Sequence, residues 1–393
     1  MTGVAEQPAR PRTSLVTVAR EWTRIGVTGF GGPPAHIALL RELVVRRMAW
    51  MDAEAFEDAN AACGLLPGPG STQLSMLCAY RVAGAPGAIV GGLGFVVPAV
   101  VLILALSEVF LGHAPPLWVR GAGAGAGAAV AAVAVHAARG LINPSYRRAR
   151  ESRERVARWA VYLAVGTGAA ALIGAYLVLA LLACGLLELF LQSRSWPTLG
   201  ARKGPIGALV PTSITTGGIG ALAWTAFKVG ALSFGGGFVI IPLMQSDAVH
   251  TYHWMSNSQF LNAVALGQIT PGPVVATVAA VGYAAHGVAG GLLAGAVAFS
   301  PSFSFILLGG QHFERLRTHS GPRAFLDGAG PAAIGAILGA AITLSTALTE
   351  SWQFAILAAA AIALLALKRG VVQTLLGAAL LGTIAALAGA PLP

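Results

Sequence analysis

The sequence predicts an all-α protein that crosses a membrane many times and consists of two related halves. Hydrophobic residues make up 56% of the 393 residues and charged residues only 10%, against about 25% charged in soluble globular proteins. Apolar stretches recur from residue 85 to residue 390. A bilayer span takes about 20 apolar residues, so the chain has room for roughly ten to twelve membrane segments.

An internal repeat divides the chain. The stretch 24–40, RIGVTGFGGPPAHIALL, aligns with 228–244, KVGALSFGGGFVIIPLM, at an offset of 204 residues. The same offset aligns the two PGP motifs and places Phe95 on Phe299. We therefore expect a disordered tail (1–13), a first transmembrane repeat (14–200), a polar, Gly/Pro-rich linker (201–218) and a second transmembrane repeat (219–393).

Each half is expected to contain the same elements in the same order. Glycine and proline interrupt a helix at FGG and again at PGP, two apolar helices follow, and a hairpin-like pair ends the half. The last pair of the first half has too few residues for two full spans and too many for one, so the exact span count stays open. The expected elements are 15–45, 55–82, 85–110, 117–138 and 159–191, and then 219–245, 259–285, 287–309, 325–348 and 352–390.

The distribution of arginine and lysine indicates how the halves are oriented, because these residues collect in cytoplasmic loops. Loop 139–158 carries seven arginines and its counterpart 346–353 carries none, whereas loop 311–324 carries three and its counterpart 111–120 carries one. The inverted counts predict an inverted-topology repeat, as found in many transporters. Five crossings per half would satisfy this if the PGP segment is re-entrant, although the basic N-terminal tail argues against that count.

Four Gly/Pro breaks occur in matched pairs inside the apolar segments. Unpaired backbone in lipid is unfavourable, so a break repeated in both halves indicates a binding site near the membrane midplane. Each break begins a half-helix whose free N–H groups and positive dipole end suit an anion. The alternative is that the breaks are kinks that let helices pack closely. The residues concerned are Phe30, Gly31, Gly32 and Pro33; Pro67, Gly68, Pro69, Gly70, Ser71 and Thr72; Phe234, Gly235 and Gly236; and Pro271, Gly272 and Pro273.

Charged and titratable residues near the breaks are further candidates. Arg24 and Lys228 occupy the same place, about two turns before each FGG. Cations within the membrane are unfavourable and usually functional, so both could attract an anion, or they could extend to the interface. His36 could bind a ligand or titrate. The carboxylates that could carry a coupled proton, or else face the loops, are Glu57, Asp58 and Glu108.

Several classes of protein are excluded or disfavoured. The HExxH, GxSxG and Walker A motifs are absent, so the chain is not expected to be an enzyme or an ATP-driven pump. The three cysteines lie in apolar contexts without a CxxC motif, and no metal site or cofactor is expected. In a membrane protein a net charge of +10 reflects basic cytoplasmic loops rather than a nucleic-acid partner.

The motifs FGGPPAHIALL and LLPGPGSTQL, with a second FGGG and TPGP half, resemble the long-chain members of the CHR family of chromate ion transporters. The resemblance implies a secondary transporter in the bacterial cytoplasmic membrane that exports chromate, confers chromate resistance and is driven by the membrane potential or the proton gradient. It implies chromate or a similar oxyanion and the lipid bilayer as partners, and a homodimer stays open. The second half departs from the first at Gly237, Ile240 and Val274–Val275.

The residues and the resemblance together suggest one mechanism. Half-helix N-termini from the two repeats, with Arg24 and Lys228 nearby, would replace the water shell of a tetrahedral dianion, and rocking of one unit against the other would alternate access. A transporter of sulfate or another oxyanion remains an alternative, because backbone N–H groups recognise shape and charge. A membrane protein without transport function is the other alternative.

Overall fold

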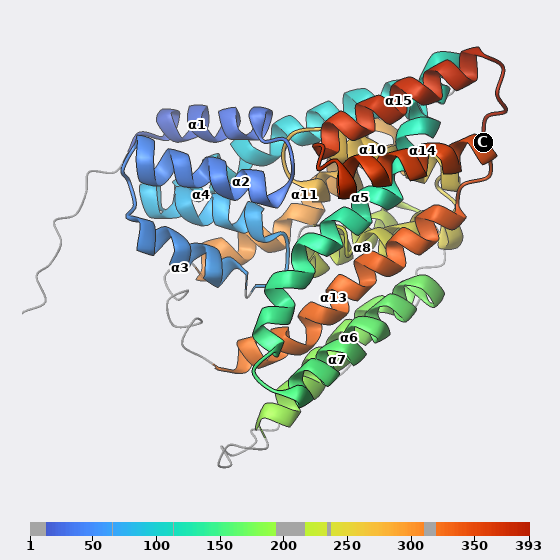
Figure 1. Ribbon diagram of the computed structural model, residues 1–393. Helices are drawn as coiled ribbons and strands as arrows, with labels where there is room; N and C mark the ends of the chain where they lie inside the picture. The colour runs from blue at the N-terminus through green and yellow to red at the C-terminus, as the bar shows by residue number, and fades with distance from the viewer. Residues whose placement is uncertain (1–12, 65, 113, 194–216, 234–236, 310–319) are drawn as a thin grey trace, which may run out of the picture.

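A computed structural model describes residues 13–64, 66–112, 114–193, 217–233, 237–309 and 320–393 (Figure 1). The predicted tail and linker lie almost entirely outside these residues. The described residues form helices and connecting turns, with no strand among them. The first half contains α1 (Leu15–Thr28), α2 (Pro33–Arg41), α3 (Ala53–Cys63), α4 (Gly70–Leu111), α5 (Leu117–Ala149), α6 (Arg153–Leu172) and α7 (Leu177–Ser193). The second contains α8 (Ile219–Leu232), α9 (Ile241–Gln245), α10 (Asn257–Ile269), α11 (Val278–Gly309), α13 (Ser320–Thr346), α14 (Ser351–Ala361) and α15 (Val371–Leu387).

Short helices of other types connect these elements. Three π-helices, η1 (Glu42–Arg47), η3 (Ser246–Thr251) and η5 (Ile362–Ala366), continue α2, α9 and α14. Two 3₁₀ helices, η2 (Gly174–Tyr176) and η4 (Val274–Thr277), precede α7 and α11. The π-helices η1 and η3 recur at the repeat offset, so even this uncommon geometry is duplicated.

Features of the backbone recur in both halves, with a change of register after the PGP motifs. Gly68 (φ 115°) and Gly272 (φ 94°) match at an offset of 204 residues. After the PGP motifs the offset is 203, since α4 kinks at Gly84 and α11 at Gly287. The alignment of Phe95 with Phe299 is therefore wrong by one residue.

The kinks explain the length of α4 and α11. A straight helix of 42 residues would measure about 63 Å, twice the hydrocarbon thickness of a bilayer. In α4 the residues before the kink return along α3, and the Arg81 Nη1 donates to Ala55 O at 3.0 Å. The PGP motif is thus the tip of a helical hairpin, and the longer part of α4 after the kink is available to span the membrane.

The FGG segment is also a hairpin rather than the broken spanning helix that the sequence predicted. Gly31 (φ 101°) and Gly32 (φ 71°) adopt conformations that other residues disfavour, and they reverse the chain. α1 and α2 then run side by side in opposite directions (Figure 1). Arg47 at the end of η1 pairs with Glu21 of α1, which fixes the open end of the hairpin.

Helices α5 and α13 each pack mainly against helices of the other half, an arrangement called here the exchange of helices. α5 of the first half packs mainly against α15, α13 and α14 of the second, and α13 packs mainly against α6, α7 and α5 of the first. Glycine permits these approaches: a Cβ atom at Gly125 would meet Ala378 O, and one at Gly335 would meet Leu163 O. Backbones that touch in this way are typical of helix packing in membranes.

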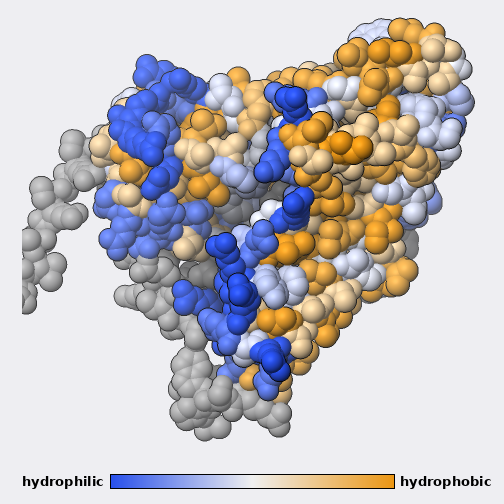
Figure 2. Space-filling view, in the orientation of Figure 1, coloured by the Kyte–Doolittle hydropathy of each residue, from blue (hydrophilic) through white to orange (hydrophobic). Residues whose placement is uncertain are grey.

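Composition and surface both fit a multi-pass membrane protein. By length and hydropathy, α4, α5, η4–α11 and α13 can cross a bilayer, and α7, α8, α14 and α15 are shorter apolar helices. Figure 2 shows hydrophilic residues gathered at one side, around α1–α3, and in a band down the face. Hydrophobic residues cover the opposite side over α14 and α15.

Candidate functional site

The helix breaks of the two halves meet inside the protein. The Gly272 N–H of the second PGP turn donates to Gly29 O, at the first FGG turn, at 3.0 Å. The first PGP turn approaches α8 in the same manner, since a Cβ atom at Gly68 would lie 3.3 Å from Gly230 O. Breaks from the two halves of the sequence therefore border one region.

The break residues differ in exposure. The second PGP turn, Pro271–Pro273, is fully buried, as are Gly68 and Pro69 of the first. Pro67 and Gly70 are half-buried, whereas Phe30 and Gly31 are exposed. Phe234, Gly235 and Gly236 lie outside the described residues.

Local sequence explains the start of each half-helix. Pro33 and Pro34 occupy the first two positions of α2, where a missing N–H is tolerated. Pro69 precedes α4, and no side chain caps this helix. The first N–H groups of α4 therefore remain without a side-chain partner and point toward the turn.

His36 connects two of the breaks. Its side chain is fully buried, with Nε2 3.0 Å from Gly29 O and Nδ1 3.3 Å from Ser71 Oγ. A carbonyl oxygen only accepts, so Nε2 carries a proton. The ring edge packs on Phe95 at 5.0 Å between centroids. His36 thus holds the FGG turn against the start of α4.

Buried polar atoms without partners surround the first PGP turn. Thr72 Oγ1, Gln73 Oε1 and Ser302 Oγ have no hydrogen-bond partner in the described structure, and these three side chains are fully buried. A Cβ atom at Gly68 would lie 2.7 Å from Gln73 Nε2 and 3.4 Å from Ser302 Oγ, so both side chains border this turn. Unpaired buried polar groups are unfavourable by about 1–3 kcal/mol each. A bound anion would accept hydrogen bonds from the two hydroxyl groups, whereas Gln73 Oε1 is itself an acceptor.

Sequence reasoning missed part of this group. Gln73 follows directly after the predicted Ser71 and Thr72, so its position in the first turn of α4 was an available signal. Ser302 lies in α11 of the other half, and only the fold brings it to Gly68. Ser233, at the end of α8, is also fully buried with an unpartnered hydroxyl.

The two predicted cations lie in different environments. Lys228 Nζ donates to Asp247 Oδ2 at 2.6 Å, and Thr225 Oγ1 donates to the same oxygen at 2.7 Å. Arg24 is exposed on α1, and no described side-chain contact joins it to the breaks. The structure therefore does not bring the two cations together at the turns, and Asp247 was not anticipated.

The candidate proton carriers lie away from the turns. Glu57 is exposed and forms an ion pair with Arg41 Nε at 3.1 Å. Glu108 is exposed and accepts a hydrogen bond from Tyr283 OH at 2.6 Å, which links the halves. Asp58 is half-buried. Proton coupling through these residues stays a prediction.

Comparisons with known proteins agree on one family. A family model described as "Chromate transporter" matches residues 16–189 and 220–383. The "Chromate transport protein" of Cupriavidus metallidurans is 30% identical over 387 residues, covering 95% of this chain and 94% of the relative. The "Probable chromate transport protein" of Synechococcus elongatus is 28% identical over 347 residues, covering 85% of each chain. No solved structure matches.

Proposed function

Because the chain belongs to the chromate transporter family, we propose that it is a secondary active transporter that exports chromate by alternating access. The observation that carries this proposal is the meeting of breaks from both halves beside buried, unpartnered polar atoms. Chromate is a tetrahedral dianion, and it needs donors on several sides once its water shell is removed.

The start of α4 supplies these donors. Its dipole places roughly half a positive charge at the first turn, where Ser71 and Thr72 carry hydroxyl groups. Ser302 approaches from α11, so the two halves would hold the anion between them. Lys228 remains paired with Asp247 and stabilises the second hairpin in this proposal rather than binding the substrate.

An inverted arrangement of the halves supports alternating access. The last turns of α5 share a pocket with the first turns of α13, through Arg148 and Leu326. The opposite ends, at Arg120 of α5 and Ala347 after α13, share another cavity. The two equivalent helices therefore run in opposite directions.

The basic loop indicates which side of the membrane faces the cytoplasm. Gln192, at the end of α7, shares its pocket with Arg148 and Arg155 of the basic loop. We assign that side to the cytoplasm.

Chromate uptake into inside-out vesicles, with and without an imposed gradient, tests the function. We expect gradient-dependent uptake that Ser302→Ala reduces and Ser300→Ala leaves unchanged. Ser300 is the matched control because its exposed hydroxyl donates to Val297 O in its own helix at 2.8 Å. Sulfate uptake without chromate uptake would identify a sulfate transporter instead, and uptake of neither would contradict the proposal.

A further inference from the structure

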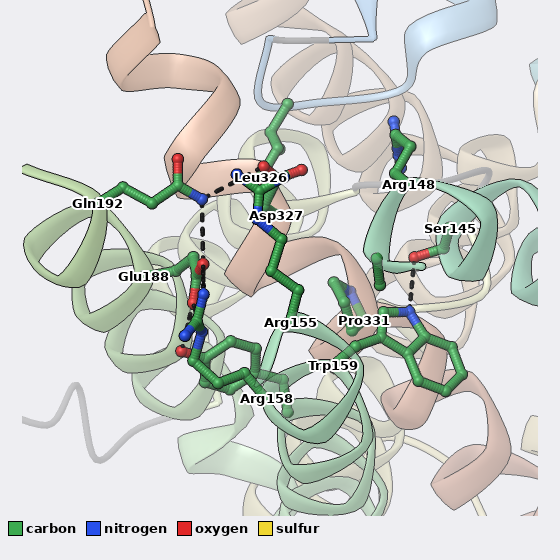
Figure 3. A pocket seen from close by; sticks show the side chains of 12 residues that line it. Ser145, Arg148, Arg155, Arg158, Trp159, Glu188, Gln192, Leu326, Asp327 and Pro331 are labelled. Carbon is green, nitrogen blue, oxygen red and sulfur yellow. Dashed lines mark hydrogen bonds and ion pairs between the residues drawn. The ribbon is translucent and has the colours of Figure 1, made fainter. Parts of the chain in front are cut away.

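Two cavities lie at opposite ends of the protein, in places that the repeat relates. The first, the ion-pair pocket, lies between the end of α5, the start of α6, the end of α7 and the start of α13 (Figure 3). The second, the Arg120 cavity, lies between the start of α5, the end of α13, the start of α14 and the chain after α15. The start of α10 also lines the second cavity. The two cavities differ in their side chains: Asp and Glu line the ion-pair pocket, and neither is among the described residues that line the Arg120 cavity.

The ion-pair pocket is filled by its own carboxylates. Arg158 donates to Glu188 through Nε at 2.9 Å and Nη2 at 3.2 Å. Tyr162 OH donates to the same carboxylate at 2.8 Å. Gln192 Nε2 bridges Glu188 at 3.0 Å and Asp327 at 3.4 Å (Figure 3). The remaining space is about 30 Å³, the room of about one water molecule.

The Arg120 cavity has a cationic side chain and no Asp or Glu among its described lining residues. Its volume is about 410 Å³, enough for an oxyanion with part of its water shell. Arg120, which is exposed, has the only charged side chain among the described lining residues. The other polar side chains are neutral hydroxyls and amides: Ser256, Ser258, Gln259, Asn262 and Gln353.

The repeat shows that carboxylates are replaced at this end. At the offset of 203, Asp327 of the ion-pair pocket corresponds to Ala124 of the Arg120 cavity. The start of α3 is acidic, whereas the corresponding start of α10 is neutral. The replaced pairs are Asp52 with Ser256, Glu54 with Ser258, Glu57 with Leu261 and Asp58 with Asn262.

Helix ends add positive potential to the cavity. α5 begins beside it at Leu117, and no side chain caps this 33-residue helix. α10 and α14 also begin there, although Ser256 caps the former and Glu350 the latter. Arg120 lies in the first turn of α5, so a fixed charge and a helix start act on the same space.

We propose that the Arg120 cavity is a second oxyanion site, a vestibule between the proposed site at the helix breaks (the central site) and the non-cytoplasmic face. The class of anion rests on the proposed function, whereas the cavity and its charge do not. α10 begins at the cavity and ends two residues before the buried Pro271–Pro273 turn, so one helix joins the vestibule to the helix breaks.

Thiol protection tests the site without relying on transport. The native Cys63, Cys78 and Cys184 are buried, so Ser258→Cys adds one accessible thiol on the cavity wall. The full-length protein is purified in detergent, and its rate of modification by N-ethylmaleimide is measured at constant ionic strength with increasing sulfate. Sulfate is the probe because it has the shape and charge of chromate without oxidising thiols. We expect saturable slowing of several-fold.

Arginine variants in the Ser258→Cys background give the decisive comparison. Arg120→Gln should abolish protection, and Arg120→Lys should restore part of it. Arg323→Gln is the matched control, because Arg323 is exposed at the corresponding position of α13 and should leave protection intact. Absence of protection, or equal protection in Arg120→Gln and Arg323→Gln, would overturn the proposal.

The experiments can reject the vestibule and the proposed transport site independently of each other. Ser302→Ala should reduce chromate uptake while sulfate still protects the thiol at position 258. Protection without chromate uptake by the otherwise unchanged protein would reject the proposed function and keep the anion site. Chromate uptake without protection would reject the vestibule alone.

Discussion

Replacing Gly68 by alanine tests whether the PGP turn serves transport or only packs helices. Gly68 has φ 115°, and placing a Cβ-bearing residue in such a conformation is unfavourable by about 1–3 kcal/mol. The added Cβ atom would lie 2.7 Å from Gln73 Nε2, so this amide must move and lose its 2.7 Å hydrogen bond to Pro67 O. That loss adds about 1 kcal/mol.

The total of about 2–4 kcal/mol shifts the equilibrium away from the native turn by on the order of 30- to 700-fold. We expect Gly68→Ala to reduce the initial rate of chromate uptake in inside-out vesicles by at least tenfold at matched protein amount. Gly140→Ala is the control, because no atom lies within 4 Å of its Cβ position in α5, and it should stay within about twofold of the wild type.

A double variant separates the two contributions. Gln73→Ala removes the side chain that the new methyl group would strike, so Gly68→Ala in that background should suffer from backbone strain alone. Wild-type uptake by the single variant Gly68→Ala would refute the assignment of this turn to the binding site.

Three further changes test other parts of the structure. Asp247→Asn leaves Lys228 without its carboxylate, and we expect it to reduce stability by about 3 kcal/mol, so an unchanged thermal midpoint in detergent would contradict this ion pair. His36→Leu removes the hydrogen bonds that the imidazole makes to Gly29 of the FGG turn and to Ser71 of α4. It should lower the thermal midpoint by the equivalent of about 2 kcal/mol of stability, and it should also reduce chromate uptake. Gly125→Leu should prevent α5 from packing on α15 and lower the yield of folded protein, whereas Gly168→Leu should not, since no atom lies within 4 Å of its Cβ position.

Matched glycines made the central features of the fold predictable. Gly68 and Gly272 break two helices at equivalent places, and both adopt positive φ in the structure. Backbone that leaves its helix inside a membrane must be covered by protein or water, so the sequence alone indicated that these turns would lie inside. It could not show that Ser302 would complete the group, because that contact joins residues of different halves.

Other features required the fold itself. A one-residue difference between the repeats after the PGP motifs put Phe95 out of register with Phe299, although both are phenylalanine. Lys228 suggested a free cation because Asp247 lies 19 residues away, and only the return of the hairpin through η3 brings the two together. The GAGAGAG run of α5 is a row of small residues, and such a row does not indicate which helix it contacts.

The exchange of helices between the halves has a consequence for biosynthesis. α5 ends at Ala149, and its main neighbour α15 begins at Val371, so the ribosome completes the first half long before that glycine face can be covered. Until then α5 has lipid or the membrane insertion machinery beside it, and a first half released alone would keep this face bare. Two separately expressed halves should therefore accumulate only when they are produced in the same cell.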